Sequence, residues 1–171
     1  MRLVMFKSAT VDQENALDPR LHHRIASANR RETSMNPETI ALVRDSWAKV
    51  EPISEQAAGL FYGRLFEVYP EVRPMFKGDM KDQGNKLVVM LTTAVNALDN
   101  LDPLIPAIKK MGARHARYGV RDDDYAKVAD ALLWTLGQGL GDDFTPEVKK
   151  AWVGVYSALA DTMKAGAAES T

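Results

Sequence analysis

The chain has 171 residues, with 22 lysines and arginines against 23 aspartates and glutamates, and 46% of its residues are hydrophobic. This length predicts one domain, and the balanced charge excludes a strongly basic surface for nucleic acid. The absence of cysteine excludes disulfides, thiolate metal sites and covalent cofactor attachment through cysteine. No apolar run approaches the roughly 18 to 20 residues that span a bilayer, so no membrane span is expected.

Residues 1–35 differ from the rest of the chain. They carry several arginines and two of the three histidines but no sustained helical stripe. The apolar segment 3–6 is too short for a secretory signal, so we expect a cytoplasmic protein. We expect either a disordered or weakly attached N-terminal extension, or a start assigned upstream of the true one at Met35. The globular domain is then residues 36–171.

From residue 36 onward, apolar residues recur at spacings of three and four, which predicts helices rather than strands. Capping residues precede proline at Asn36–Pro37, Asp102–Pro103 and Thr145–Pro146. Four glycines fall near the predicted junctions, where the backbone needs a left-handed or tight conformation: Gly78, Gly119, Gly139 and Gly141. The predicted elements are 37–49, 53–69, a short turn at 71–76, 81–98, 103–117, 122–140 and 146–165.

The globular part contains a single imidazole. His115 is the only histidine after residue 35, which excludes a multi-histidine zinc or copper site. Phosphate-loop, dinucleotide-binding and hydrolase motifs are also missing from the sequence. A haem requires only one protein ligand, because the porphyrin supplies four nitrogens and the sixth position remains open for a gas.

Three candidate residues also have ordinary structural explanations. His115 continues an apolar stripe, and a lone histidine of this kind is more often a core residue bonded to a carbonyl. Gln83 heads another apolar stripe, where it can be a boundary residue with its amide in water. Tyr62 lies in a dense apolar segment, where its hydroxyl can find a carbonyl. Their order along the chain, with Phe76 between Tyr62 and Gln83, makes them informative together.

Several separated motifs closely resemble bacterial globins of the flavohaemoglobin and Vitreoscilla-haemoglobin type, and related single-domain bacterial globins. These motifs are Phe61–Tyr62, PEVRPMF at 70–76, RHARYGV at 114–120, and Tyr125. The resemblance covers residues 36–165. It implies an all-α globin fold, a three-over-three helical sandwich around non-covalent haem b.

The resemblance also implies roles for individual residues. His115 matches the proximal iron ligand, and its other ring nitrogen is expected to bond the carbonyl of Met111. Tyr62 and Gln83 match the distal pair that faces the gas. The remaining haem contacts match the aromatic packed flat on the porphyrin, an apolar distal residue and two proximal positions, namely Phe76, Leu87, Val120 and Val128.

Two further features concern the surroundings of the proximal histidine and the edge of the haem. Tyr125 matches a tyrosine that in flavohaemoglobins joins a network with a glutamate on the last helix and the proximal histidine. Ala167 stands at about the place of that glutamate, so a strong peroxidase-like push is not expected. Three cations fall near the expected haem edge, where they either pair with propionates or remain solvated, namely Lys86, Arg114 and Arg117.

The leading functional prediction is reversible binding of dioxygen, and of carbon monoxide and nitric oxide, by a monomer or weak homodimer. Two distal donors predict slow dioxygen release. Nitric oxide dioxygenation is expected with a separate reductase, because the flavin domain of flavohaemoglobins has no counterpart in these 171 residues. The alternatives are a haem-based gas sensor and a haem-free helical bundle. His115 and Phe76 together argue against the haem-free bundle.

Overall fold

The computed structural model describes residues 35–170, so the predicted N-terminal extension lies outside the described residues apart from Met35. Within that range the chain forms helices and no strand. The α-helices are α2 (Pro37–Val50), α3 (Ser54–Val68), α4 (Met80–Asn96), α5 (Ile105–Arg117), α6 (Asp122–Leu140) and α7 (Pro146–Glu169). Short 3-10 turns separate some of them: η1 (Glu51–Ile53), η2 (Pro70–Met75), η3 (Asp102–Leu104) and η4 (Gly141–Asp143). No helix in the described range has both the length and the apolar character needed to cross a membrane.

Side-chain caps explain where several helices begin. Asn36 accepts the amide of Glu38 at 2.8 Å, and Thr145 accepts the amide of Val148 at 3.3 Å, as the sequence predicted. Asp79, which the sequence analysis missed, caps α4 by accepting two amides. The prediction at Asp102 is wrong. Asp102 opens η3 and makes no side-chain cap, and α5 begins only at Ile105.

Three glycines at junctions between helical elements have positive φ angles. Gly78 has φ of 101°, Gly119 of 88° and Gly141 of 55°, as expected for residues at junctions. The prediction for Gly139 is wrong, because α6 continues through Leu140 and Gly139 lies inside it. Gly141 is therefore the residue that lets the chain leave α6.

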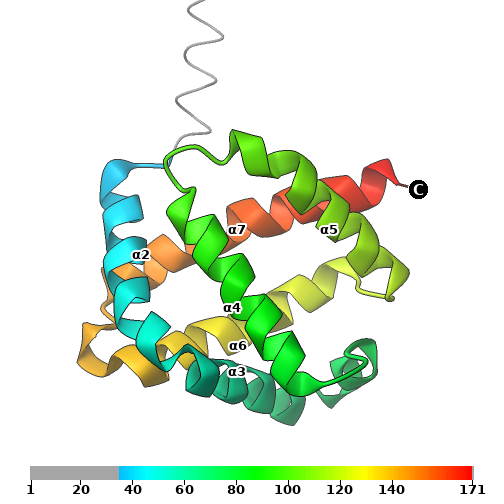
Figure 1. Ribbon diagram of the computed structural model, residues 1–171, viewed down its shortest axis with the longest axis horizontal. Coiled ribbons are helices and arrows are strands. Elements are labelled where there is room, and N and C mark those ends of the chain that lie inside the picture. Colours follow the sequence, from blue (N-terminus) through cyan, green and yellow to red (C-terminus); the bar gives the residue numbers. More distant parts are fainter. Residues whose placement is uncertain (1–34, 171) are drawn as a thin grey trace, which may run out of the picture. The chain divides into compact units, whose positions relative to one another are not determined.

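The backbones of α5 and α7 touch where the two helices cross (Figure 1). A Cβ added at Gly112 would overlap the carbonyl of Met163, and a Cβ added at Gly166 would overlap the carbonyl of Lys109. The predicted end of the last helix at residue 165 is wrong. The helix continues through Gly166 to Glu169. The close crossing requires a glycine at position 166, because a Cβ there would overlap α5.

A tryptophan pair joins α2 to α7 in the main core. The rings of Trp47 and Trp152 lie 5.9 Å apart, and Trp152 is almost fully buried. The indole N–H of Trp152 donates to Ser46 at 2.9 Å, and that of Trp47 donates to Thr92 of α4 at 3.1 Å. In Figure 1, α4 lies in front of α6 and α7. This packing fixes α4 and α7, two of the helices that border the cavity described next.

Candidate functional site

A cavity of about 430 Å³, the central cavity, is enclosed by side chains from α3 to α7 and from η2. Its volume falls within the roughly 300 to 1,000 Å³ of cofactor pockets. Apolar side chains such as Phe76, Leu87 and Val128 pack against the core yet are only half-buried, because part of their surface faces this space. The haem contacts that the sequence analysis expected line it, together with two of the three expected cations: Tyr62, Phe76, Gln83, Lys86, Leu87, Arg114, His115, Val120, Tyr125 and Val128.

His115 presents one ring nitrogen to the central cavity. Its Nδ1 lies 2.9 Å from the carbonyl oxygen of Met111, so the predicted contact is present. A carbonyl only accepts, so Nδ1 carries the proton and Nε2 keeps a free lone pair. Burial lowers the pKa of His115, although the bond to Met111 opposes this, and the charge of Arg114 lowers the pKa further. At neutral pH the ring is therefore a neutral imidazole, the form that binds metals.

Tyr62 reaches the same cavity from α3, a helix well separated from α5 (Figure 1). Its ring sits among Phe61, Phe66 and Phe76, with centroid distances of 4.9, 5.8 and 5.5 Å. Its hydroxyl donates to the backbone carbonyl of Gln83 at 3.3 Å, a long hydrogen bond. Burial raises the pKa of Tyr62 to about 12, so the hydroxyl remains a donor across the physiological range.

The side chain of Gln83 lies at the edge of the cavity and bonds away from it. Its Nε2 donates to the carbonyl of Lys77 at 3.2 Å, in the turn that precedes α4. This bond is exposed. The contact is the one expected of a boundary glutamine, and a role toward a ligand would require the amide to turn inward.

Tyr125 packs against α7 at positions that precede Ala167. The α7 residues of this cluster are Tyr156, Ala160 and Met163, and the hydroxyl of Tyr156 donates to the backbone carbonyl of Tyr125 at 2.6 Å. The amine of Lys164 lies 5.4 Å from the ring centroid of Tyr125. Among the described residues, the charged α7 group in contact with Tyr125 is therefore the cation of Lys164. Burial and the charge of Asp122 on α6 raise the pKa of Tyr125.

Lys86 and Arg114 line the cavity with exposed side chains, whereas Arg117 is not among its lining residues. The sequence analysis missed Asp124, which is 3% exposed and also lines the cavity. Asp124 accepts the amine of Lys127 at 2.8 Å and the amide of Arg121 at 2.9 Å. The signal for it was the run of aspartates at 122–124, whose last member completes a capping box.

The side chains that line the central cavity determine which cofactor it can hold. Within residues 35–170 no three His, Cys, Asp or Glu side chains come together to hold a metal ion. The central cavity instead offers one neutral imidazole, apolar walls and two cations at its margin. A flat prosthetic group that brings four metal ligands of its own fits this arrangement. Fold and site together define an all-helical protein of the haem-binding class.

The chain belongs to the globin family, whose family model matches residues 59–163. Membership of this family implies haem as the cofactor. The fold is thus the all-α globin fold that the sequence predicted.

Three similar proteins illustrate this membership, and a fourth shares the fold. The flavohemoprotein of Bacillus subtilis (strain 168) is 27% identical over 130 residues, covering 74% of this chain but 33% of that protein, so this chain spans a third of its length. Neuroglobin of Tetraodon nigroviridis is 27% identical over 143 residues, covering 75% of this chain and 90% of that protein. The solved structure of the engineered carbene transferase RmaNOD, a candidate nitric oxide dioxygenase from Rhodothermus marinus, has a TM-score of 0.72 at 31% identity and covers 79% of this chain and 94% of that one. A hexacoordinated haem protein from an anhydrobiotic tardigrade, at 16% identity, covers 81% of this chain and 98% of that one with a TM-score of 0.72, and shows the shared fold alone.

Proposed function

We propose that this globin holds haem b non-covalently through Nε2 of His115 and binds dioxygen reversibly, together with carbon monoxide and nitric oxide. One observation carries the proposal. A lone imidazole, with its Nδ1 already bonded to Met111, and a buried tyrosine hydroxyl reach one apolar cavity from different helices.

Haem held by His115 would supply an iron that binds diatomic gases, and bound dioxygen would gain negative charge while carbon monoxide would gain much less. Tyr62 is the donor best placed to respond to that charge. Its present bond to Gln83 is long at 3.3 Å, so redirecting the hydroxyl costs little. In an apolar pocket each such donor contributes on the order of 1 kcal/mol or more.

Gln83 is the second donor in this proposal. Its amide must first leave the carbonyl of Lys77, and because that bond is exposed, water can replace it. The amide then turns toward the cavity that the residue already lines. Gln83 therefore contributes less than Tyr62.

The proximal surroundings favour reversible binding over peroxide chemistry. The acceptor for His115 is a neutral carbonyl, and the charged α7 group against the ring of Tyr125 is the cation of Lys164. Neither pulls the remaining proton from the imidazole as a carboxylate would. Lys86 and Arg114, at the margin of the cavity, would pair with the propionates.

Nitric oxide dioxygenation is the proposed associated reaction. Nitric oxide, dioxygen and one electron combine to give nitrate, and the electron comes from a separate reductase. The flavohemoprotein and RmaNOD relatives support this part of the proposal.

The test uses purified holo-protein on a single reduced sample. Optical spectra, the dioxygen release rate and nitric oxide consumption with nitrate formation are measured in turn. We expect a Soret band, slow release of dioxygen and conversion of nitric oxide to nitrate. A protein that purifies without haem and takes up none would contradict the proposal.

A further inference from the structure

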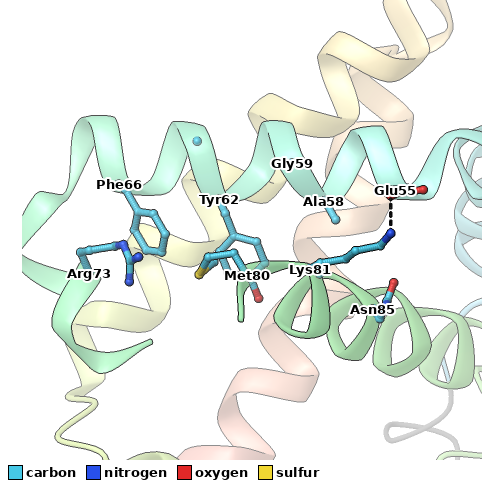
Figure 2. Close-up of a pocket in the computed structure, with 11 residues that line it drawn as sticks. Glu55, Ala58, Gly59, Tyr62, Phe66, Arg73, Met80, Lys81 and Asn85 are labelled. Atoms are coloured by element: carbon cyan, nitrogen blue, oxygen red, sulfur yellow. Dashed lines mark ion pairs between the residues drawn. The ribbon is translucent and has the colours of Figure 1, made fainter. Parts of the chain in front are cut away.

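A second cavity, of about 460 Å³, lies between α3 and α4 and is referred to below as the α3–α4 cavity. Figure 2 shows Tyr62 and Met80 in its middle, Phe66 and Arg73 at one end, and Glu55, Lys81 and Asn85 at the other. It is separate from the central cavity, and among the described residues Tyr62 is the one that lines both. Tyr62 therefore borders both spaces.

Glycines on α3 leave this space open. A Cβ added at Gly59 or at Gly63 would meet no atom within 4 Å. Close by, Gly84 of α4 lets the two helices approach, because an added Cβ would lie 3.1 Å from that of Ala58. The helices are thus in near contact at Ala58 and Gly84, while the space beside Gly59 and Gly63 stays empty of side chains.

The rim is charged and the interior is apolar. Glu55 and Lys81 pair across the rim at 3.5 Å, as the dashed line in Figure 2 marks. Their side chains are 81% and 73% exposed, so the pair is weak and opens readily. Inside, the walls are mainly the rings of Tyr62 and Phe66 and the thioether of Met80. A small apolar molecule suits these walls, whereas an ion would lose its hydration.

The hydroxyl of Tyr62 is weakly held. One long hydrogen bond, 3.3 Å to the carbonyl of Gln83, holds it. Gly59 and Gly63 place no side chain in the α3–α4 cavity beside Tyr62, so a rotation of the phenol in that direction would meet no side chain of these two residues. Such a rotation would join the α3–α4 cavity to the central cavity for a moment.

We propose that the α3–α4 cavity is the route by which dioxygen enters and leaves the central cavity, with Tyr62 as the movable partition. This inference rests on the proposed function, because the gas must bind in the central cavity. It adds a path and a second role for Tyr62, which then controls access as well as donating a hydrogen bond.

The test blocks the route with Gly59→Phe, which fills open space and does not touch the central cavity. Gly154→Phe is the matched control, because Gly154 is also helical, exposed and free of neighbours within 4 Å, and lies on α7 outside both cavities. Carbon monoxide serves as the photolysable probe on reduced holo-protein. Association is measured after flash photolysis and dissociation by ligand replacement.

A blocked path slows entry and exit alike and leaves the equilibrium constant unchanged. We expect Gly59→Phe to lower both rates by a common factor of about five or more, and the control to leave both unchanged. Gly63→Phe, on the same wall one turn later, should do the same if Gly59→Phe fails to fold. Unchanged rates in the variants, or a slower association with weakened affinity, would overturn the route.

Xenon provides a readout that is independent of gas kinetics. Xenon occupies dry apolar cavities, so crystals of the wild-type holo-protein under xenon should hold an atom beside Gly59 and Met80. An α3–α4 cavity that holds only water would overturn the proposal. If the reduced holo-protein bound no gas at all, the proposed function would fail and this inference with it. If it bound gas but the variants behaved like wild type, only the route would fail.

Discussion

Gly112 of α5 lies against the backbone carbonyl of Met163 of α7, with no room between them for a Cβ. Gly166 meets the carbonyl of Lys109 in the same way, so each helix contributes a glycine to one crossing. His115 follows Gly112 by three residues and thus projects from nearly the same face of α5. The crossing therefore sets the depth at which the imidazole meets the central cavity.

Substitution of Gly112 by alanine should separate the two helices. The added methyl group meets backbone, which cannot rotate away as a flexible side chain could. We expect Gly112→Ala to lower the free energy of unfolding by about 1–3 kcal/mol and to weaken haem retention, since His115 moves with α5. Thermal unfolding and the Soret absorbance measure the two effects. Gly154→Ala, in open space on α7, should be neutral or slightly stabilising, and equal effects at both positions would contradict the argument.

Asp124 should support the start of α6 only while it is ionised. Burial raises its pKa, but the hydrogen bonds from Lys127 and Arg121 outweigh this and hold the pKa below its ordinary value of 3.8. A depressed pKa means stability that is present above about pH 4 and lost as the pH falls through the folded-state pKa. We expect Asp124→Asn to lower the free energy of unfolding by about 1 kcal/mol at pH 7.

The stability difference between wild type and Asp124→Asn should depend on pH. This difference should shrink as the pH falls below about 4, because the unfolded wild-type chain then binds a proton that the folded carboxylate, with its lowered pKa, still resists. Thermal midpoints from pH 3 to pH 7 measure it. Asp122→Asn, an exposed acid in the same first turn, is the control and should show a smaller difference. A gap that persists unchanged at pH 3 would rule out the ionic explanation.

Local rules of sequence account for much of the fold and part of the site. The caps at Asn36 and Thr145 follow from their own neighbours, as does the contact from His115 to Met111, because residues four apart on a helix are adjacent. The resemblance to known globins placed the other expected haem contacts, which line one cavity, whereas the expected cation Arg117 does not line it.

Contacts between distant segments were not predictable in the same way. The sequence analysis ended the last helix at residue 165, whereas α7 continues through Gly166, which lies against the carbonyl of Lys109 on another helix. The neighbours of Tyr125 on α7 are fixed by how that helix packs against α5 and α6, which the sequence alone does not show. The α3–α4 cavity depends on missing side chains, and no periodic pattern signals it.

Deletion of residues 1–34 tests the predicted domain boundary. These residues lie outside the described part of the structure, so the boundary stays a proposal. We expect the truncated chain, beginning at Met35, to bind haem and to unfold at nearly the temperature of the full chain. Differential scanning calorimetry of the two holo-proteins measures this. A large drop in the midpoint would mean that the segment packs on the globin domain.

Removal of the imidazole should abolish ordinary haem attachment. Among residues 35–170 there is no other histidine to replace it, so His115→Gly should lose the normal ferrous spectrum and release haem quickly. Added imidazole should restore the spectrum, because it can enter the space that the side chain leaves. Ala116→Gly, exposed on the same helix, controls for the backbone effect of glycine. A normal spectrum in His115→Gly without imidazole would refute the axial role.

The distal pair can be tested by comparing two gases. If Tyr62 and Gln83 donate to dioxygen, then Tyr62→Phe and Gln83→Leu should each speed its release roughly 5- to 150-fold. This corresponds to a barrier to release that is lower by about 1–3 kcal/mol. Tyr62→Phe should have the larger effect, because the Gln83 amide must first leave the carbonyl of Lys77. The double variant should exceed the sum of the single effects, because each single variant lets the remaining donor reorient toward the shared acceptor.

Carbon monoxide separates this role from the role of Tyr62 in access. A hydrogen bond distinguishes the gases only through the charge on the ligand, so carbon monoxide release should change much less. A looser partition at position 62 would instead speed entry and exit of both gases by the same factor. The ratio of the two release rates therefore reports the hydrogen bond alone. In the wild type that ratio should stay constant from pH 6 to pH 9, because the pKa of Tyr62 is about 12. Equal acceleration of both gases in Tyr62→Phe and in Gln83→Leu would leave the distal pair without support.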